Sequence, residues 1–411
     1  MVEALEIKMD FKQTNVGIIP SDWEVKSLGQ FGVVSGRVGW KGYTKKDIRN
    51  SGPYAIGAKH IDKSNRLDLS DPTYLSIEKY LESPEIMVFK EDILIVQRGS
   101  IGKVVLINRE IGKATINPSM VIFRLKKNSP VYVFYYLISS PGQNQIIFDT
   151  SSTGVPMITQ KQVSNFKIPL PPTKAEQTAI ATALNDADAL ITQLEILIAK
   201  KRAIKQGAMQ ELLKPKDGWE VKNLGQIADI RRGASPRPIK DPKWFSDSGR
   251  GWIRISDVTS SNVYLNSTTQ YLSEDGARNS VAVNRGDLIM SICATIGIPI
   301  IINIPACIHD GFVLFQNYEK ELDTFFLYFC LQVKTEILTG KGQPGTQKNL
   351  NTTIVGDIEI DYPDVDEQRK IGLILRNIDI EISGLENKLN KYKMIKQGMM
   401  QNLLTGRIRL V

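Results

Sequence analysis

The chain has 411 residues, of which 42% are hydrophobic and 23% are charged, and this globular composition excludes disorder, collagen-like repeats and a disulfide scaffold. The 52 Lys and Arg residues against 44 Asp and Glu residues give a net charge of +8, which permits nucleic-acid binding without specifying it. Three cysteines without Cys-x-x-Cys spacing argue against a zinc site and for a reducing compartment. We expect these cysteines to be small residues of the hydrophobic core.

Neither the N-terminus nor any internal segment predicts a membrane protein. Residues 1–11 carry four charged side chains and lack the apolar core of a signal peptide. Residues 288–308 are uncharged and long enough to span a bilayer, but their prolines and isoleucine-rich runs favour buried strands joined by a turn. We therefore expect a cytoplasmic protein.

The chain contains one module twice. Residues 22–30 recur as residues 218–226, at an offset of 196 positions, and residues 205–213 recur as residues 396–404, at an offset of 191. The ends of the two copies match better than their middles do. This pattern indicates a common scaffold that carries two different binding surfaces.

Each copy has a globular part that is followed by a long helix. The globular parts are predicted over residues 1–170 and 215–363, and the helices over residues 171–214 and 364–411. Within the first globular part the pattern predicts strands at 93–96, 104–107 and 121–125 and a helix at 131–139.

Apolar residues at alternating steps of four and three form a heptad seam on both helices. The seam consists of Ile180, Leu184, Ile191, Leu194 and Ile198 in the first helix and Ile371, Leu375, Ile378, Ile382, Leu385 and Leu389 in the second. Lys201, Lys205 and Lys396 interrupt it at similar places. The spacing predicts that the helices pack together or against partner helices, and amphipathic helices on the surface of a single globule are the alternative.

Most catalytic motifs are missing from the sequence. It contains no Walker A loop, no Gly-x-Ser-x-Gly elbow and no His-Glu-x-x-His motif. Residues 340–345 have the spacing of a dinucleotide-binding loop, but Pro344 lies inside them, and a flexible loop is the better interpretation.

A metal-dependent nuclease is the enzymatic alternative. Glu24 and Lys26, and likewise Glu220 and Lys222, have the Glu-x-Lys spacing in which a carboxylate holds a metal and a lysine polarises a phosphodiester. A strand with Trp, Val and Leu inward and Glu and Lys outward explains the same residues without catalysis. We therefore expect no catalytic residue and no metal ligand.

Basic and amide residues gather in loops of the globular parts, where they could neutralise phosphates or read base edges. The candidate DNA-binding residues are Arg37, Trp40, Lys41, Lys59, His60, Arg98, Lys103, Gln160 and Lys161 in the first copy and Arg231, Arg232, Arg237, Arg254, Lys341, Gln347 and Lys348 in the second. The alternative to DNA binding is that these loops are simply charged and solvated. For His60 and His309 the alternative is a structural position on the surface or in a turn.

Taken together, these features resemble the specificity subunit of type I restriction–modification systems over essentially the whole chain. Residues 17–29 are similar to the family's opening signature, and residues 168–180 are similar to its entry into the first conserved helix. In the second copy, residues 360–363 depart from the Ile-Pro-Leu-Pro-Pro pattern, but Glu367 and Gln368 repeat Glu176 and Gln177.

The resemblance implies an α+β fold with two mixed α/β target recognition domains, related by internal duplication and separated by two long helices that form an antiparallel coiled coil. It implies a non-catalytic subunit in which each domain reads one half of a bipartite, asymmetric target in double-stranded DNA. The helices would set the spacer between the half-sites and dock two adenine methyltransferase subunits, and restriction subunits with translocase and nuclease activity would join this core.

No cofactor is expected on this chain, because the resemblance places S-adenosylmethionine, ATP and Mg on the partner subunits. A helix of about 40 residues is about 60 Å long, enough to hold two domains about one 34 Å turn of DNA apart. Inserting four residues near Ala199 is then expected to lengthen the spacer. The metal-dependent nuclease and a coiled-coil scaffold without DNA binding are the competing hypotheses.

Overall fold

The computed structural model describes residues 10–37, 42–126, 128–148, 156–318, 320–340 and 350–410. The chain forms two compact units, one made of Met1–Leu194 with Lys388–Val411 and the other of Glu195–Asn387. The long helices α6 (Lys174–Leu212) and α12 (Val365–Leu403) each contribute one part to each unit.

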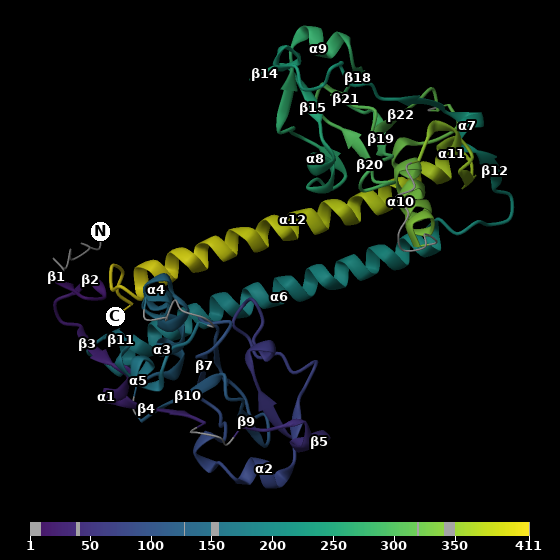
Figure 1. Ribbon diagram of the computed structural model, residues 1–411. Coiled ribbons are helices and arrows are strands. Elements are labelled where there is room, and N and C mark those ends of the chain that lie inside the picture. The colour runs from purple at the N-terminus through teal and green to yellow at the C-terminus, as the bar shows by residue number, and fades with distance from the viewer. Residues whose placement is uncertain are drawn as a thin grey trace, which may run out of the picture. The chain divides into compact units, whose positions relative to one another are not determined.

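The first unit contains a four-stranded sheet in the order β4-β10-β7-β8 and a three-stranded sheet in the order β6-β5-β9 (Figure 1). Its strands are β1 Phe11–Thr14, β2 Gly17–Pro20, β3 Glu24–Ser27, β4 Gly32–Gly36, β5 Ile48–Ile56, β6 Tyr74–Leu75, β7 Ile93–Val96, β8 Val104–Leu106, β9 Ala114–Ile116, β10 Met120–Leu125 and β11 Lys167–Leu170. Its shorter helices are α1 Leu28–Phe31, α2 Ile77–Leu81, α3 Pro130–Ile138, α4 Ser140–Phe148 and α5 Gln160–Asn165. The predicted strands and helix of this part are confirmed as β7, β8, β10 and α3.

The second unit contains two five-stranded sheets, in the orders β13-β22-β19-β20-β16 and β14-β17-β15-β21-β18. Its strands are β12 Glu220–Asn223, β13 Asp229–Arg232, β14 Phe245–Ser246, β15 Arg250–Ile253, β16 Tyr264–Leu265, β17 Gln270–Leu272, β18 Val281–Val283, β19 Leu288–Ser291, β20 Pro299–Ile302, β21 Ala306–Ile308, β22 Phe312–Gln316 and β23 Glu359–Tyr362. Its shorter helices are α7 Leu224–Ile227, α8 Ile255–Thr259, α9 Glu274–Arg278, α10 Thr324–Gly340 and α11 Thr352–Gly356.

The uncharged stretch 288–308 is sheet, as predicted, because it forms β19, β20 and β21. Among the described residues no helix combines the length and the hydropathy that crossing a bilayer requires.

The strand order confirms the duplication. The first unit pairs β4-β10-β7-β8 and the second pairs β13-β22-β19-β20 in the same arrangement. A parallel pair also occurs at the equivalent place in each unit, β5 with β9 and β15 with β21. The two globular parts are therefore copies of one fold.

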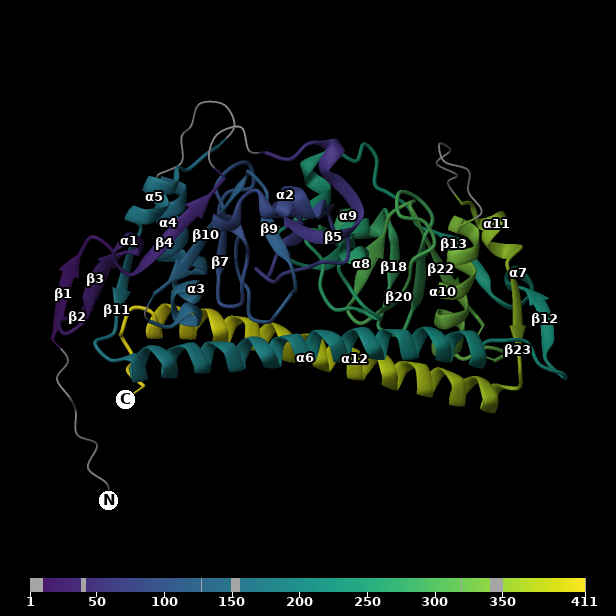
Figure 2. The same ribbon diagram turned by 90° about the horizontal axis from the view of Figure 1, so that it is seen from below.

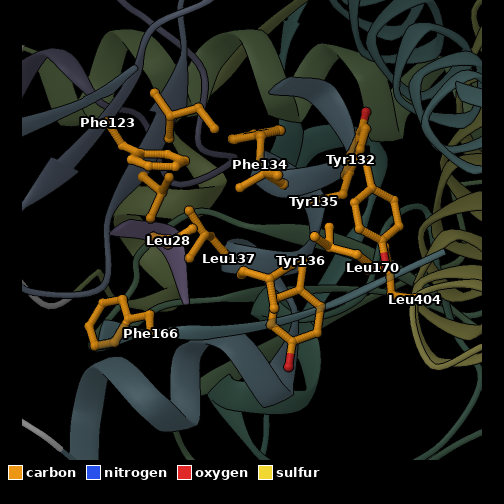
Figure 3. Close-up of a cluster of buried hydrophobic side chains, with 14 of the residues drawn as sticks. Leu28, Phe123, Tyr132, Phe134, Tyr135, Tyr136, Leu137, Phe166, Leu170 and Leu404 are labelled. Atoms are coloured by element: carbon orange, nitrogen blue, oxygen red, sulfur yellow. The ribbon is translucent and has the colours of Figure 1, made fainter. Parts of the chain in front are cut away.

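Helix α3 forms the centre of the first unit's core (Figure 3). Tyr132 is fully buried there, and its hydroxyl donates a hydrogen bond to the carbonyl of Pro169 at 2.7 Å. Leu404, directly after α12, belongs to the same cluster together with Ile180 and Leu184 of α6. The long helices are thus part of the hydrophobic core of the globular part. In the second unit, Ile371 and Leu375 of α12 join the core around α10 in the same way.

In each unit a part of α6 lies beside a part of α12 (Figures 1 and 2). The seam residues Ile180, Leu184, Ile191, Leu194, Ile198, Ile371, Leu375 and Ile382 are buried, and Ile378, Leu385 and Leu389 are half-buried. The predicted packing of the two helices is confirmed.

Ion pairs between the helices fix their direction. In the second unit Lys201 of α6 pairs with Glu381 of α12 at 2.7 Å, whereas Lys216, four residues beyond the end of α6, pairs with Glu367 near the start of α12 at 3.1 Å. The α12 partner comes earlier in the sequence as the chain advances along and past α6, so the helices run antiparallel there. In the first unit Asp188 of α6 pairs with Lys396 of α12 at 2.6 Å, and Glu176 near the start of α6 pairs with Arg409 beyond the end of α12, which gives the same direction.

The predicted orientation of the Trp-Glu-Val-Lys-x-Leu segments is correct in the first copy and wrong in part of the second. Trp23 and Leu28 are fully buried, but Val221 is 57% exposed. Lys222 instead turns toward the domain and pairs with Glu321 at 2.9 Å. Because successive side chains of a strand point to opposite faces, the neighbouring Val221 of β12 points outward.

Candidate nucleic-acid interface

Four predicted arginines of the second unit surround the turn between β21 and β22. Arg231 and Arg232 lie on β13, which pairs antiparallel with β22 next to the turn. Arg254 directly follows β15, which pairs in parallel with β21 and ends opposite Ile308. Arg237 lies in the loop after β13. Strand pairing therefore brings together basic residues that are separated in the sequence.

Asp310, at the tip of this turn, binds two of these four arginines. Arg232 donates from Nε to the Asp310 carbonyl at 2.8 Å, and Ser235 donates from its hydroxyl to Oδ1 at 2.7 Å. Arg237 lies 3.3 Å from Oδ2. The hydrogen bond from Ser235 lowers the pKa of Asp310, so the side chain is an ionised acceptor at neutral pH.

A cavity of about 440 Å³ opens beside this turn. Its lining consists of Ser235, Arg237, Ile239, Trp252, Arg254, Ile255, Ser256, His309 and Asp310. Trp252 is only 1% exposed and lies 5.7 Å from the His309 ring, measured between ring centroids. The cavity thus combines an aromatic wall with charged groups of both signs.

His309 is a half-buried part of this wall. Its Nδ1 accepts the backbone N–H of Gly311 at 2.9 Å, and its ring lies 4.8 Å from that of Phe312. Burial lowers the pKa of His309, so the ring is neutral at pH 7.

The first unit uses the equivalent positions differently. Ile56 pairs with Ile116 as Ile253 pairs with Ile308, so Asn117 and Gly57 stand where His309 and Arg254 stand in the second unit. The Asn117 side-chain carbonyl accepts hydrogen bonds from Ser119, and nearby Gln97 donates to the Pro118 carbonyl at 3.1 Å. This turn therefore presents amide groups instead of a carboxylate.

Several predicted residues of the first unit have structural contacts. Arg37 is only 9% exposed and donates from Nε to the carbonyl of Ile116 at 3.0 Å, and burial lowers its pKa. Lys103 donates to the carbonyls of Ala58 and Ile61 at 3.0 and 2.8 Å. Lys59 pairs with Asp71 at 2.6 Å. The contacts of Lys103 and Lys59 hold the loop after β5 in place.

His60 lies in the short 3-10 turn Ala58–His60, as one of the two predicted positions had it, but it is not a surface residue, because the side chain is 3% exposed. Nδ1 accepts the N–H of Gly57 at 2.9 Å, and Nε2 lies 3.1 Å from the Asp71 carbonyl, to which it can only donate. These contacts define a neutral ring protonated on Nε2, and burial lowers its pKa.

Arg98 and Lys161 are exposed, and Gln160 begins α5 with its side chain against Gly36. Trp40, Lys41, Lys341, Gln347 and Lys348 lie outside the described residues, as do most of residues 340–345. Asp310 and Trp252 were not among the residues predicted from the sequence. An Asp-Gly turn directly after a buried strand was the signal that could have indicated Asp310.

The Glu-x-Lys triplets form ion pairs on the surface. Glu24 contacts Lys26 at 2.6 Å, and this lysine lowers the pKa of Glu24. Lys222 lies 3.5 Å from Glu220 and closer to Glu321. Within the described ranges, no group of three or more His, Cys, Asp or Glu side chains is arranged to hold a metal ion.

Two copies of one α/β domain, joined through paired antiparallel helices and bearing different polar turns, define a duplicated recognition protein. The model of the family described as Type I restriction modification DNA specificity domain matches residues 20–205 and 216–393. The chain belongs to this family. It is the non-catalytic specificity subunit of a type I system, with two target recognition domains.

Similar proteins span nearly the whole chain. Type I restriction enzyme MjaVIII specificity subunit of Methanocaldococcus jannaschii is 26% identical over 98% of this chain and 96% of its own. Putative type I restriction enzyme MjaX specificity subunit of the same organism is 26% identical over 98% of this chain and 97% of its own. The solved S subunit of a type I restriction-modification system from M. genitalium shares the fold, with a TM-score of 0.63 at 16% identity over 97% of both chains.

Proposed function

We propose that each target recognition domain binds double-stranded DNA and reads one half of a bipartite, asymmetric target. The supporting observation is that one fold carries different side chains at one equivalent turn, Asn117 in the first unit and His309 with Asp310 in the second. Amide and carboxylate groups pair with different base edges, so the two turns suit different sequences.

The paired helices α6 and α12 would set the spacer between the half-sites and dock two adenine methyltransferase subunits. Restriction subunits with translocase and nuclease activity would complete the enzyme. In this assembly the chain itself holds no cofactor, and S-adenosylmethionine, ATP and Mg are bound by the partners.

The first experiment is co-expression of the chain with the adenine methyltransferase subunit of its own system, followed by mapping of methylated adenines across the host genome. The expected result is one motif of two short parts with a fixed gap. A soluble complex that methylates no such motif would contradict the proposal.

Exchange of residues 215–363 for the corresponding domain of a relative tests the division of labour. Only one half of the methylated motif is expected to change, because the first domain and both helices are retained. The reciprocal exchange of residues 1–170 is the matched control and should change only the other half. A change in both halves after either exchange would contradict independent reading.

Two alternatives have different signatures. Magnesium-dependent cleavage by the isolated chain, lost on Glu24→Gln with Glu220→Gln, would identify a nuclease. DNA affinity of the assembled complex that does not fall with rising salt would favour a scaffold, because contacts to phosphate release counterions.

A further inference from the structure

The cavity beside the β21–β22 turn holds an acceptor whose position is fixed. Asp310 is held through its carbonyl by Arg232 and through its carboxylate by Ser235 and Arg237. A carboxylate has about four lone-pair sites, and these contacts occupy two of them. The side chain is 43% exposed, so the remaining lone pairs are open to a ligand.

Arg254 provides a donor in the same cavity. Its backbone N–H donates to the Asp257 carboxylate at 2.9 Å, and Asp257 is 5% exposed and also binds Thr269. The main chain at Arg254 is therefore anchored. Its guanidinium is exposed and has no bonded partner within the ranges that the structure describes.

The carboxylate beside the arginine favours a base pair over a simple phosphate as the ligand. An ionised carboxylate at the cavity repels phosphate, whereas a base pair offers donors and acceptors side by side. A carboxylate can only accept hydrogen bonds, so it cannot pair with guanine or thymine, whose major-groove edges present only acceptors. Adenine offers an amino group, but its acceptor N7 lies beside it and would face the carboxylate. Cytosine presents only the N4 amino group, and its partner guanine presents O6 and N7, the atoms that arginine binds bidentately.

We propose that Asp310 and Arg254 read a C·G base pair in the half-site bound by the second unit, with Asp310 accepting from cytosine N4 and Arg254 donating to guanine O6 and N7. This inference rests on the proposed function, since it requires that the second domain reads DNA. It adds the identity of one base pair and of the two side chains that select it.

The test uses the complete complex with its methyltransferase. The methylated motif is mapped for the wild type, Asp310→Ala and Arg254→Gln, and binding is measured on duplexes in which each C·G pair of the second half-site is replaced by T·A. The wild type is expected to bind the correct duplex about 5- to 100-fold more tightly than the substituted one. Both variants should lose most of this ratio at the same base pair.

Asp310→Asn sharpens the test because asparagine is the side chain that pairs with adenine. It retains an oxygen for Ser235, and it should shift the preference at that position from cytosine toward adenine. Asp275→Asn is the matched control, since Asp275 is an exposed acid of the same unit that pairs with Arg278. Its motif should equal that of the wild type.

The first half-site serves as a folding control in every variant, because it is read by the other unit. A wild-type motif whose second half lacks a C·G pair would overturn the inference, as would variants that keep the wild-type preference or relax two different base pairs. In those cases the proposed function stands. Absence of any two-part motif for the wild type would overturn both.

Discussion

Gln177 and Gln368 show what the repeated Glu-Gln pair does at the level of single residues. Gln368 is fully buried, accepts the N–H of Asp323 at 2.8 Å and donates to the carbonyls of Glu321 and Pro363. Gln177 donates to the carbonyl of Pro171 in the same manner. Each glutamine thus fastens the first turn of a long helix to its globular part, because buried polar groups require such partners.

The two histidines predict a pH dependence of stability. Burial lowers the pKa of both His60 and His309 below the ordinary value of 6.5. As the pH falls through 6.5, the unfolded chain takes up these protons and the folded chain does not, so the free energy of unfolding decreases. Urea unfolding midpoints should therefore be lower at pH 5.5 than at pH 7.5.

His60→Gln and His309→Gln should each reduce this dependence, because glutamine offers an acceptor and a donor but does not titrate. Asp310, the carboxylate next to His309, has a pKa lowered from 3.8, so it titrates below this window and does not interfere. An unchanged difference between the two pH values in the double variant would contradict the assignment.

At the level of the helices, the lysines that interrupt the seam are paired across it. Lys205 contacts Asp379 at 2.7 Å and Lys396 contacts Asp188 at 2.6 Å. Both lysines and both aspartates are related by the repeat offset of 191 positions. The sequence predicted the seam and the lysines that interrupt it. It did not predict which acidic residues pair with these lysines, because that depends on the antiparallel register of the two helices, which no local sequence pattern specifies.

Lys205→Met should destabilise the second unit. Asp379 is 14% exposed, and burial already raises its pKa, so loss of the lysine leaves a buried carboxylate without a cation. The expected cost is about 3–5 kcal/mol in the free energy of unfolding, measured in urea.

Arg202→Gln, three residues before Lys205, is the matched control. Arg202 pairs with Glu386 at 2.6 Å but is 65% exposed, and its loss should cost about 1 kcal/mol or less. The further variant Lys205→Met with Asp379→Leu should recover much of the lost stability. Equal costs for the two single variants would show that burial of the pair is unimportant.

On the scale of the whole molecule, the internal repeat was sufficient to predict two copies of one module, because matching segments mark the start of each globular part and the end of each long helix. The site was less predictable. Strand pairing decides which loops meet, so Arg237, Arg254 and Asp310 came together without any shared motif. The same pairing turned Arg37 and Lys103 inward, where they bind backbone carbonyls.

The spacer hypothesis makes the last prediction, and the register of the helices determines how to test it. Residues inserted near Ala199 in α6 alone would displace Lys201 and Arg202 from Glu381 and Glu386. One heptad inserted after Ala199 and another after Asn387 keeps both the seam and these pairs in register, because Glu381 and Glu386 then move together with Lys201 and Arg202. Seven residues lengthen a helix by about 10.5 Å, close to three base pairs of DNA.

The methylated motif of this variant should contain the same two half-sites with a gap about three base pairs longer. Substituting seven exposed residues of both helices without changing their length is the control, and it should leave the gap unchanged. New letters in either half-site would mean that the helices influence base reading, and an unchanged gap in the longer variant would mean that they do not set the spacing.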